Sequence, residues 1–155
     1  MSEIDRIVRM LTKTFDKGAW HGPTVREVLQ NVKATHAHDR AGASHSIVEL
    51  VLHMASWRQF AIRRLLGDGA YEVSPEMNFP SVANRSWEEA KEQLEESQRE
   101  LIKAARAFPE DRLGELVPSS SYKYTYYTLL HGIIHHDLYH IGQIQLILKA
   151  NESKP

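Results

Sequence analysis

The histidines are the residues of this sequence best suited to chemistry, because there are nine of them and no cysteine. Two of them, His136 and His140, are four residues apart in an apolar run that includes Ile133 and Ile147. At about 100° per residue, these four side chains fall on one helical stripe facing the core. Imidazoles at this spacing can share one metal ion at about 2.0–2.1 Å from nitrogen. An unpaired buried polar group costs about 1–3 kcal/mol, so the pattern favours a metal over its alternative, two core histidines hydrogen bonded to side chains or water.

A third protein ligand would be a histidine or a carboxylate, since cysteine is absent. His53 is the best candidate, because it lies within another apolar helical segment, on the flank of its apolar face. Three imidazoles leave coordination positions open, which is typical of catalytic sites. All-imidazole ligation suits Zn, Ni, Cu or Fe and fits Ca or Mg poorly. We therefore predict a divalent transition metal, with Zn or Ni favoured and Fe as a further candidate.

Polar residues near these histidines are candidates for the outer part of the site. Gln143 shares the stripe of the histidine pair, and Glu49 lies one turn before His53. Either can orient a ligand or a bound water. Asp137 is displaced by about 100° from His136, and we interpret it as an ordinary polar helix residue. The remaining histidines are expected elsewhere: His131 and His135 toward solvent, a subunit or a covering loop, and His21, His36, His38 and His45 in loops or caps.

Several other kinds of chemistry are disfavoured. The segment His136–His140 resembles the protease motif H-E-x-x-H with aspartate for glutamate, but that side chain is shorter and few residues remain for a downstream third ligand. No nucleophile elbow, phosphate-binding loop or dinucleotide fingerprint occurs. A formal net charge of -1 gives no field for nucleic acid or an anionic membrane. Arg58, Arg63 and Arg64 cluster in one segment, which we interpret as a solvated helix face.

Four segments with helical periodicity must position these residues. The first covers Ile4 to Phe15, and the second runs from a capping box at Ser46 and Glu49 to Gly67. The third runs from a capping box at Ser86 and Glu89 to Pro109, and the fourth from about Tyr124 to Ala150. A short helix is expected between Thr24 and Lys33, and the period-two run Tyr122–Tyr126 has no second run with which to pair. The 155 residues therefore predict a single all-α domain, 1–155, built on four helices.

Long connections separate these helices, at residues 18–45, 68–85 and 109–121. Simple up-down bundles use short loops, so these lengths predict at least one crossover and irregular segments over the bundle ends, where pockets are common. No stretch approaches about 18 uncharged apolar residues, and the first residues form no apolar leader. We therefore expect a cytoplasmic protein with no membrane partner.

Two runs carry a likeness to a known family: His45-Ser-Ile-Val-Glu-Leu-Val-Leu-His53-Met and His135-His136-Asp-Leu-Tyr-His140-Ile-Gly-Gln143-Ile. They resemble the DinB-like superfamily, which includes the YfiT-like metal-dependent enzymes. Trp20-His21-Gly-Pro and Trp87 support the likeness, which extends over nearly the whole chain. The resemblance implies a four-helix bundle of up-down-down-up type with long crossover connections, and a homodimer. It also implies a divalent metal held by His53, His136 and His140.

Some branches of the superfamily are thiol transferases or isomerases that use low-molecular-weight thiols such as bacillithiol or mycothiol. The resemblance thus implies a metal-dependent enzyme with a small-molecule substrate, either a thiol-dependent S-transferase or a hydrolase, that activates thiol or water. The alternative is a non-catalytic, dimeric metal-binding module with a structural ion. A fourth protein ligand, such as His21 or Glu49, would favour that alternative, in which the tyrosine-rich segment 122–127 serves packing or a subunit interface.

Overall fold

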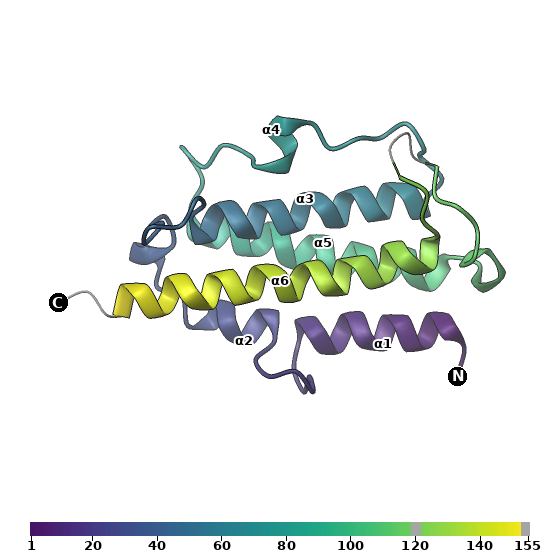
Figure 1. The fold of residues 1–155 in the computed structure, drawn as a ribbon, viewed down its shortest axis with the longest axis horizontal. Coiled ribbons are helices and arrows are strands. Elements are labelled where there is room, and N and C mark those ends of the chain that lie inside the picture. The colour runs from purple at the N-terminus through teal and green to yellow at the C-terminus, as the bar shows by residue number, and fades with distance from the viewer. Residues whose placement is uncertain (119–121, 153–155) are drawn as a thin grey trace.

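The computed structural model describes residues 1–118 and 122–152 (Figure 1). Among these residues, all secondary-structure elements longer than a single bridge are helices. Four long helices form the bundle: α1 Glu3–Phe15, α3 Ile47–Leu65, α5 Trp87–Ala107 and α6 Tyr126–Glu152. Shorter elements lie in the connections: α2 Val25–Gln30, α4 Pro75–Asn78, and the 3-10 turns Ala34–His36 and Glu110–Arg112. The all-α prediction is confirmed, including the short helix expected between Thr24 and Lys33.

The helix starts follow from local side-chain chemistry. Capping boxes begin α1 at Ser2, α2 at Thr24, α3 at Ser46 and α5 at Ser86. In each box a hydroxyl and a carboxylate satisfy backbone N–H groups that have no partner inside the helix. Beyond the end of α3, Gly67 has a φ of 87°, which glycine adopts without steric cost.

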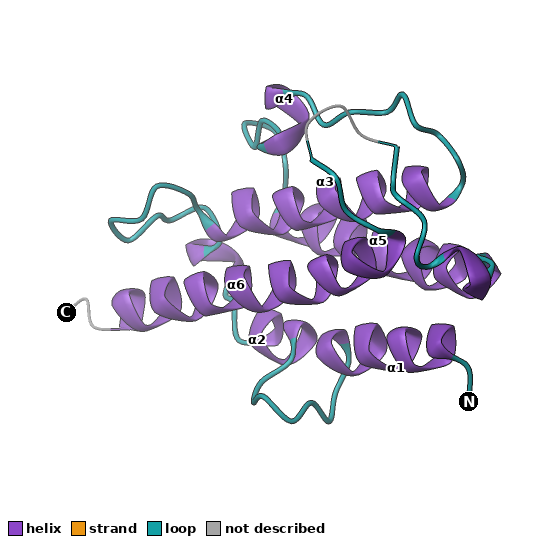
Figure 2. Ribbon diagram, turned by 45° about the vertical axis from the view of Figure 1, so that its right-hand side comes forward, coloured by secondary structure: helices purple, strands orange, loops and turns teal. Residues whose placement is uncertain are grey.

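The long helices have the up-down-down-up arrangement. In Figure 1, α1 and α6 run toward one end of the bundle, and α3 and α5 run toward the other. Because α3 and α5 are parallel, the connection between them, residues 66–86, must return along the length of the bundle. This segment, which we call the crossover, carries α4 and arches over α3 in Figure 2.

The start of α6 differs from the prediction. The helix begins at Tyr126 rather than at about Tyr124. The amide of Val117 donates a hydrogen bond to the carbonyl of Tyr124 (2.9 Å), and Leu116 and Thr125 form an isolated β-bridge. The tyrosine-rich run therefore does have a pairing partner, which the sequence pattern did not reveal because only one bridge forms.

Two apolar clusters fill the bundle, and polar side chains are buried between them. One cluster contains apolar side chains from residues 60–65 of α3 and 126–134 of α6. The other contains apolar side chains from residues 47–55 of α3 and 141–147 of α6. Residues of α1, α2 and α5 complete the two clusters. The central polar layer between them consists of His53, Arg58, Gln98, His136, Asp137 and His140. In the described part of the chain, no helix combines the length and apolar character needed to cross a membrane.

Candidate metal centre

Three imidazoles from two helices converge in the central polar layer. His53 projects from the middle of α3, while His136 and His140 lie one turn apart on α6. The Nε2 atom of His136 lies 3.1 Å from Nε2 of His53 and 3.0 Å from Nε2 of His140. Nitrogens that share one ion at about 2.0–2.1 Å lie about 3 Å apart, so this spacing fits a common ion. The structure thus brings the three predicted residues together, and they form the group of described residues able to hold a metal.

The other ring nitrogens of His53 and His140 are held by oxygen acceptors. Nδ1 of His53 lies 2.7 Å from the backbone carbonyl oxygen of Asn78, and Nδ1 of His140 lies 2.6 Å from Oε1 of Gln143. A carbonyl oxygen can only accept, so both Nδ1 atoms must donate. This fixes the tautomer and leaves a lone pair on each Nε2, as metal ligation requires.

These tautomers leave the cluster short of hydrogen-bond donors. With Nε2 of His53 and of His140 both acting as acceptors, the single ring proton of His136 cannot serve both at full strength. The Nδ1 atom of His136 is itself buried without a hydrogen-bond partner among the described residues. A cation would satisfy all three Nε2 lone pairs at once, so the donor set fits a transition metal.

The three imidazoles are held in the neutral form. Burial lowers the pKa of His136 to about 3, and the neighbouring rings of His140 and His53 add to the effect. Burial lowers the pKa of His140 to about 4, although its hydrogen bond to Gln143 opposes the shift. The pKa of His53 is also lowered, again chiefly by burial. Neutral imidazole is the form that binds metals, so the site needs no deprotonation at neutral pH.

The crossover covers one side of the site through Asn78 and Phe79. The backbone carbonyl of Asn78 accepts a hydrogen bond from Nδ1 of His53. The side-chain Oδ1 of Asn78 accepts a second one from the indole Nε1 of Trp57 (2.9 Å). The ring of Phe79 stacks on His53, with centroids 4.3 Å apart, and on His45, with centroids 3.8 Å apart. No sequence pattern predicts these contacts, because they join an irregular segment to α3.

A buried ion pair lies next to the three histidines. The guanidinium of Arg58 donates to Oδ2 of Asp137 at 2.6 Å, to Oε1 of Gln98 at 3.1 Å and to the carbonyl of Met54 at 3.3 Å. The side chains of Arg58 and Asp137 are 0% and 2% exposed. Burial raises the pKa of Asp137 to about 6, while the charge and hydrogen bond of Arg58 oppose the rise.

The ion pair corrects two predictions. The arginine cluster is not a solvated face, because Arg58 and Arg64 are buried and only Arg63 is exposed. Asp137 is likewise a buried, paired residue rather than an ordinary polar one. A signal was present in both cases: Arg58 shares a helical face with Met54, Ala61 and Leu65, and Asp137 shares one with Leu130, Ile133, Ile141 and Ile144.

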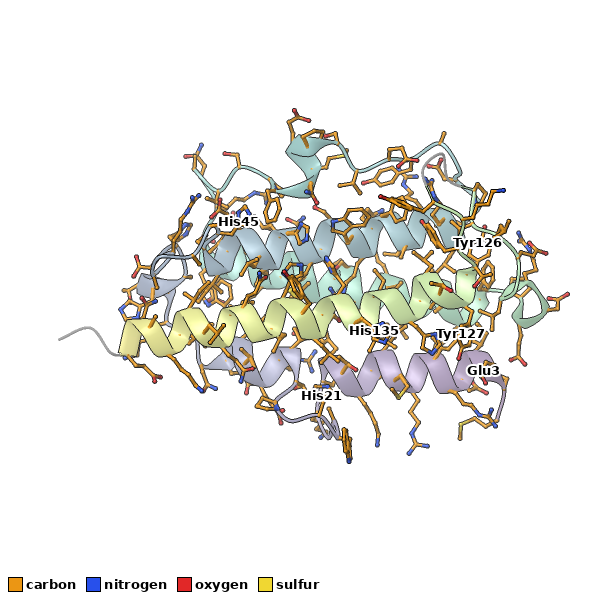
Figure 3. The ribbon with its side chains drawn as sticks, in the orientation of Figure 1. Glu3, His21, His45, Tyr126, Tyr127 and His135 are labelled. Atoms are coloured by element: carbon orange, nitrogen blue, oxygen red, sulfur yellow. The ribbon has the colours of Figure 1, made fainter. Side chains whose placement is uncertain are left out.

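The remaining predicted residues lie around or away from the centre. Gln143 contacts His140, as described. Glu49 belongs to the cap of α3, where its carboxylate accepts from the Ser46 amide and from Arg40, each at 2.7 Å. In Figure 3, His21 and His135 lie on the α1 side of α6, whereas His45 lies at the start of α3. Neither Glu49 nor His21 belongs to the three-histidine group, so neither is a fourth ligand among the described residues.

A cavity of about 420 Å³ opens beside His136. Its described walls are mostly apolar or aromatic and come from α3, α6, the crossover and the segment before α6: Trp57, Phe60, Glu72, Tyr122, Tyr124, Thr128, Leu129, Gly132, Ile133 and His136. The centre is thus closed on one side by the crossover and reached on another through this cavity.

Comparison with known protein families gives a match over most of the chain. A family model for the DinB superfamily matches residues 20–144, which include all three histidines of the centre. Comparisons with curated proteins and with solved structures give no match.

Proposed function

The chain belongs to the DinB superfamily, and on that premise we propose that it is a divalent-metal-dependent enzyme whose ligands are His53, His136 and His140. The observation that carries the proposal is the convergence of three Nε2 atoms whose outer ring nitrogens are already engaged at His53 and His140. Zn or Ni suits this all-imidazole donor set best, with Fe as a further candidate.

An open coordination position supports catalysis over the alternative, a module with a structural ion. Structural zinc sites are closed by four protein ligands. The group found among the described residues has three, and Glu49 and His21, which would have favoured closure, are engaged or placed elsewhere. The cavity beside His136 gives a small molecule access to the side that protein ligands leave open.

The reaction that we propose is thiol-dependent S-transfer, or hydrolysis where water takes the place of the thiol. A divalent ion bound here would lower the pKa of a coordinated thiol or water and so supply a nucleophile at neutral pH. The chain's own residues prepare the site: Asn78 and Gln143 fix the tautomers of two imidazoles, and Phe79 shields His53 from solvent. A small-molecule electrophile in the cavity would be held next to the nucleophile.

We also propose that the protein acts as a homodimer. The support is a largely apolar surface between α1 and α6 around a cavity of about 940 Å³. Its lining includes Met10, Trp20 and Leu138, and also the basic residues Arg6, Arg9 and Lys13. Trp20 is fully exposed, and burial of such a residue against a second copy would stabilise the pair.

The metal is tested by elemental mass spectrometry of protein purified without a histidine tag. Wild type should carry about one Zn, Ni or Fe per chain, and His136→Ala/His140→Ala should carry almost none while keeping its helical circular dichroism. The matched control is His131→Ala/His135→Ala, which removes two histidines of the same helix that lie outside the group and should leave the metal content unchanged.

Two results would contradict the proposal. If wild type stays metal-free after reconstitution, the three residues are hydrogen-bonded core histidines rather than metal ligands. If metal binds, thiols are screened against electrophiles with wild type and the double variant. Equal turnover by the metal-free double variant would then exclude a catalytic role for the ion.

A further inference from the structure

The cavity beside His136 has a composition that selects its occupant. On the α3 side it is lined by Trp57 and Phe60, whose rings meet edge to face with centroids 5.3 Å apart. On the α6 side it is lined by Leu129 and Ile133. The indole N–H of Trp57 is already donated to Asn78, so this ring offers the cavity mainly its carbon surface.

The charges at the cavity are neutralised. Glu72 is the one Asp, Glu, Lys or Arg among its described lining residues, and its carboxylate accepts a hydrogen bond from the buried guanidinium of Arg64 at 2.7 Å. In the metal-free protein, an anion entering the cavity would therefore meet a carboxylate and no lysine or arginine side chain among the described residues.

The cavity also has room that the chain leaves unfilled. Its volume of about 420 Å³ falls in the usual range for small-molecule pockets, and a cavity of about 150 Å³ already accepts benzene. Gly132 lines it, and a Cβ atom added there would meet no heavy atom within 4 Å. A side chain at this position would enter free space on the α6 wall.

We propose that this cavity binds an uncharged, apolar group of one or two rings and holds it beside the open side of the metal centre. As the substrate-binding part of an enzyme, this assignment rests on the proposed function. It names the substrate class: a compact hydrophobic electrophile or thiol.

The binding test uses 2-naphthylmethanol as the uncharged probe and 2-naphthoate as its anionic counterpart. Binding is followed by NMR through the indole N–H signal of Trp57 in ¹⁵N-labelled protein. The indole signals of Trp20 and Trp87 serve as internal controls. In metal-free protein, where no ion can coordinate the carboxylate, the alcohol should shift the Trp57 signal selectively, and the carboxylate should bind about tenfold more weakly or worse. Equal binding of the two probes to metal-free protein, or no selective shift of Trp57, would overturn the proposal.

A glycine pair of α6 supplies the matched variants. Gly132→Leu should fill the cavity and weaken binding of 2-naphthylmethanol by about tenfold or more. Gly142→Leu adds the same side chain to the same helix, also with no heavy atom within 4 Å of its Cβ, but outside the lining, and should bind as wild type does. Unchanged affinity in folded Gly132→Leu would place the probe elsewhere. Gly132→Ala, which makes the smallest change, serves if the leucine variant fails to fold, and it should weaken binding by a smaller factor.

Measurements with and without metal separate substrate binding in the cavity from the metal-dependent function. The titrations are run on metal-loaded and on metal-free protein, with the metal content measured in each sample. If wild type takes up no metal even after reconstitution but binds the probe selectively, the cavity assignment stands and the enzyme proposal is wrong. If wild type binds metal but does not bind the probe selectively, the cavity assignment is wrong and the enzyme proposal stands.

Discussion

At the scale of single residues, the centre depends on which atom of each imidazole carries the proton. His53 and His140 each donate through Nδ1 to an oxygen acceptor, one on the backbone of Asn78 and one on the side chain of Gln143. Such acceptors orient the ring and raise its basicity as a ligand. The side-chain acceptor can be removed by mutation, which makes Gln143 the more informative of the two.

Replacing Gln143 by leucine should weaken metal binding by about 10–100-fold, because His140 loses the acceptor that fixes its tautomer. The dissociation constant is measured by competition with a chromophoric chelator. Gln145→Leu, two residues further along α6, is the control and should bind metal as wild type does. An unchanged constant in Gln143→Leu would mean that the Gln143 contact does not orient the ligand.

Acidification should destabilise the metal-free protein. The folded-state pKa values of His136 and His140 are lowered to about 3 and about 4, whereas the unfolded chain titrates near 6.5. Below pH 6.5 the unfolded chain therefore binds more protons, and folding free energy is lost as the pH falls toward 4. Asp137, whose pKa is raised to about 6, contributes in the opposite direction, but its single contribution is smaller than the sum of those of the two histidines.

The free energy of unfolding should fall by roughly 2–4 kcal/mol between pH 7 and pH 5, measured by urea denaturation of the metal-free chain. The variant His136→Ala/His140→Ala, which lacks both groups, should show a much smaller change. Stability that stays constant or rises over this interval in wild type would contradict the assigned protonation states.

At the scale of elements, the central polar layer ties the helices together. Arg58 of α3 bonds Asp137 of α6 and Gln98 of α5, and Gln98 in turn donates to the carbonyl of Leu11 in α1 (3.3 Å). One network thus joins all four long helices between the two apolar clusters. Because hydrogen bonds have defined geometry, it fixes how the helices are aligned next to the histidines, whereas apolar packing tolerates sliding.

Arg58→Met should lower the free energy of unfolding by about 3–5 kcal/mol, since it leaves the Asp137 carboxylate buried without its partner. The double variant Arg58→Met/Asp137→Leu should recover most of this loss. Arg63→Met is the control: its side chain is 48% exposed and its pair with Asp68 spans 3.7 Å, so a change of about 1 kcal/mol at most is expected. A small effect of Arg58→Met in urea denaturation would mean that the ion pair contributes little.

At the scale of the whole molecule, the two sides of α6 face different surroundings. Its α3 side carries the histidine centre, and the α1 side faces a groove in which apolar residues such as Met10 and Trp20 reach solvent. A dimer formed across the α1 side would leave the crossover and the cavity beside His136 free for a substrate. Activity and assembly would then use separate surfaces.

Trp20→Ala should shift the protein from dimer toward monomer, because a large aromatic surface is lost from the proposed interface. Sedimentation velocity over a concentration series measures the shift. Leu66→Ala removes a side chain that is also exposed, at 70%, but lies at the end of α3, and it should leave the association unchanged. A monomeric wild type, or equal association of wild type and Trp20→Ala, would exclude this interface.

Sequence alone determined the features that depend on neighbours along the chain. Capping boxes, glycine stops and the i, i+4 spacing of His136 and His140 act within one or two helical turns, so the long helices and the histidine pair could be predicted. The apolar periodicity around Arg58 and Asp137 also indicates their burial, and the prediction of exposure is wrong because it rests on their charge alone.

Only the tertiary structure decided how these pieces meet. His53 lies 83 residues before His136, and helical geometry restricts the side to which it points but not its neighbour. The contacts of Asn78 and Phe79 come from the irregular crossover, which has no periodicity to interpret. The cavity likewise forms where α3, α6 and two connections leave space between them. Local interactions specify each helix, whereas the partners across the bundle follow from packing of the whole chain.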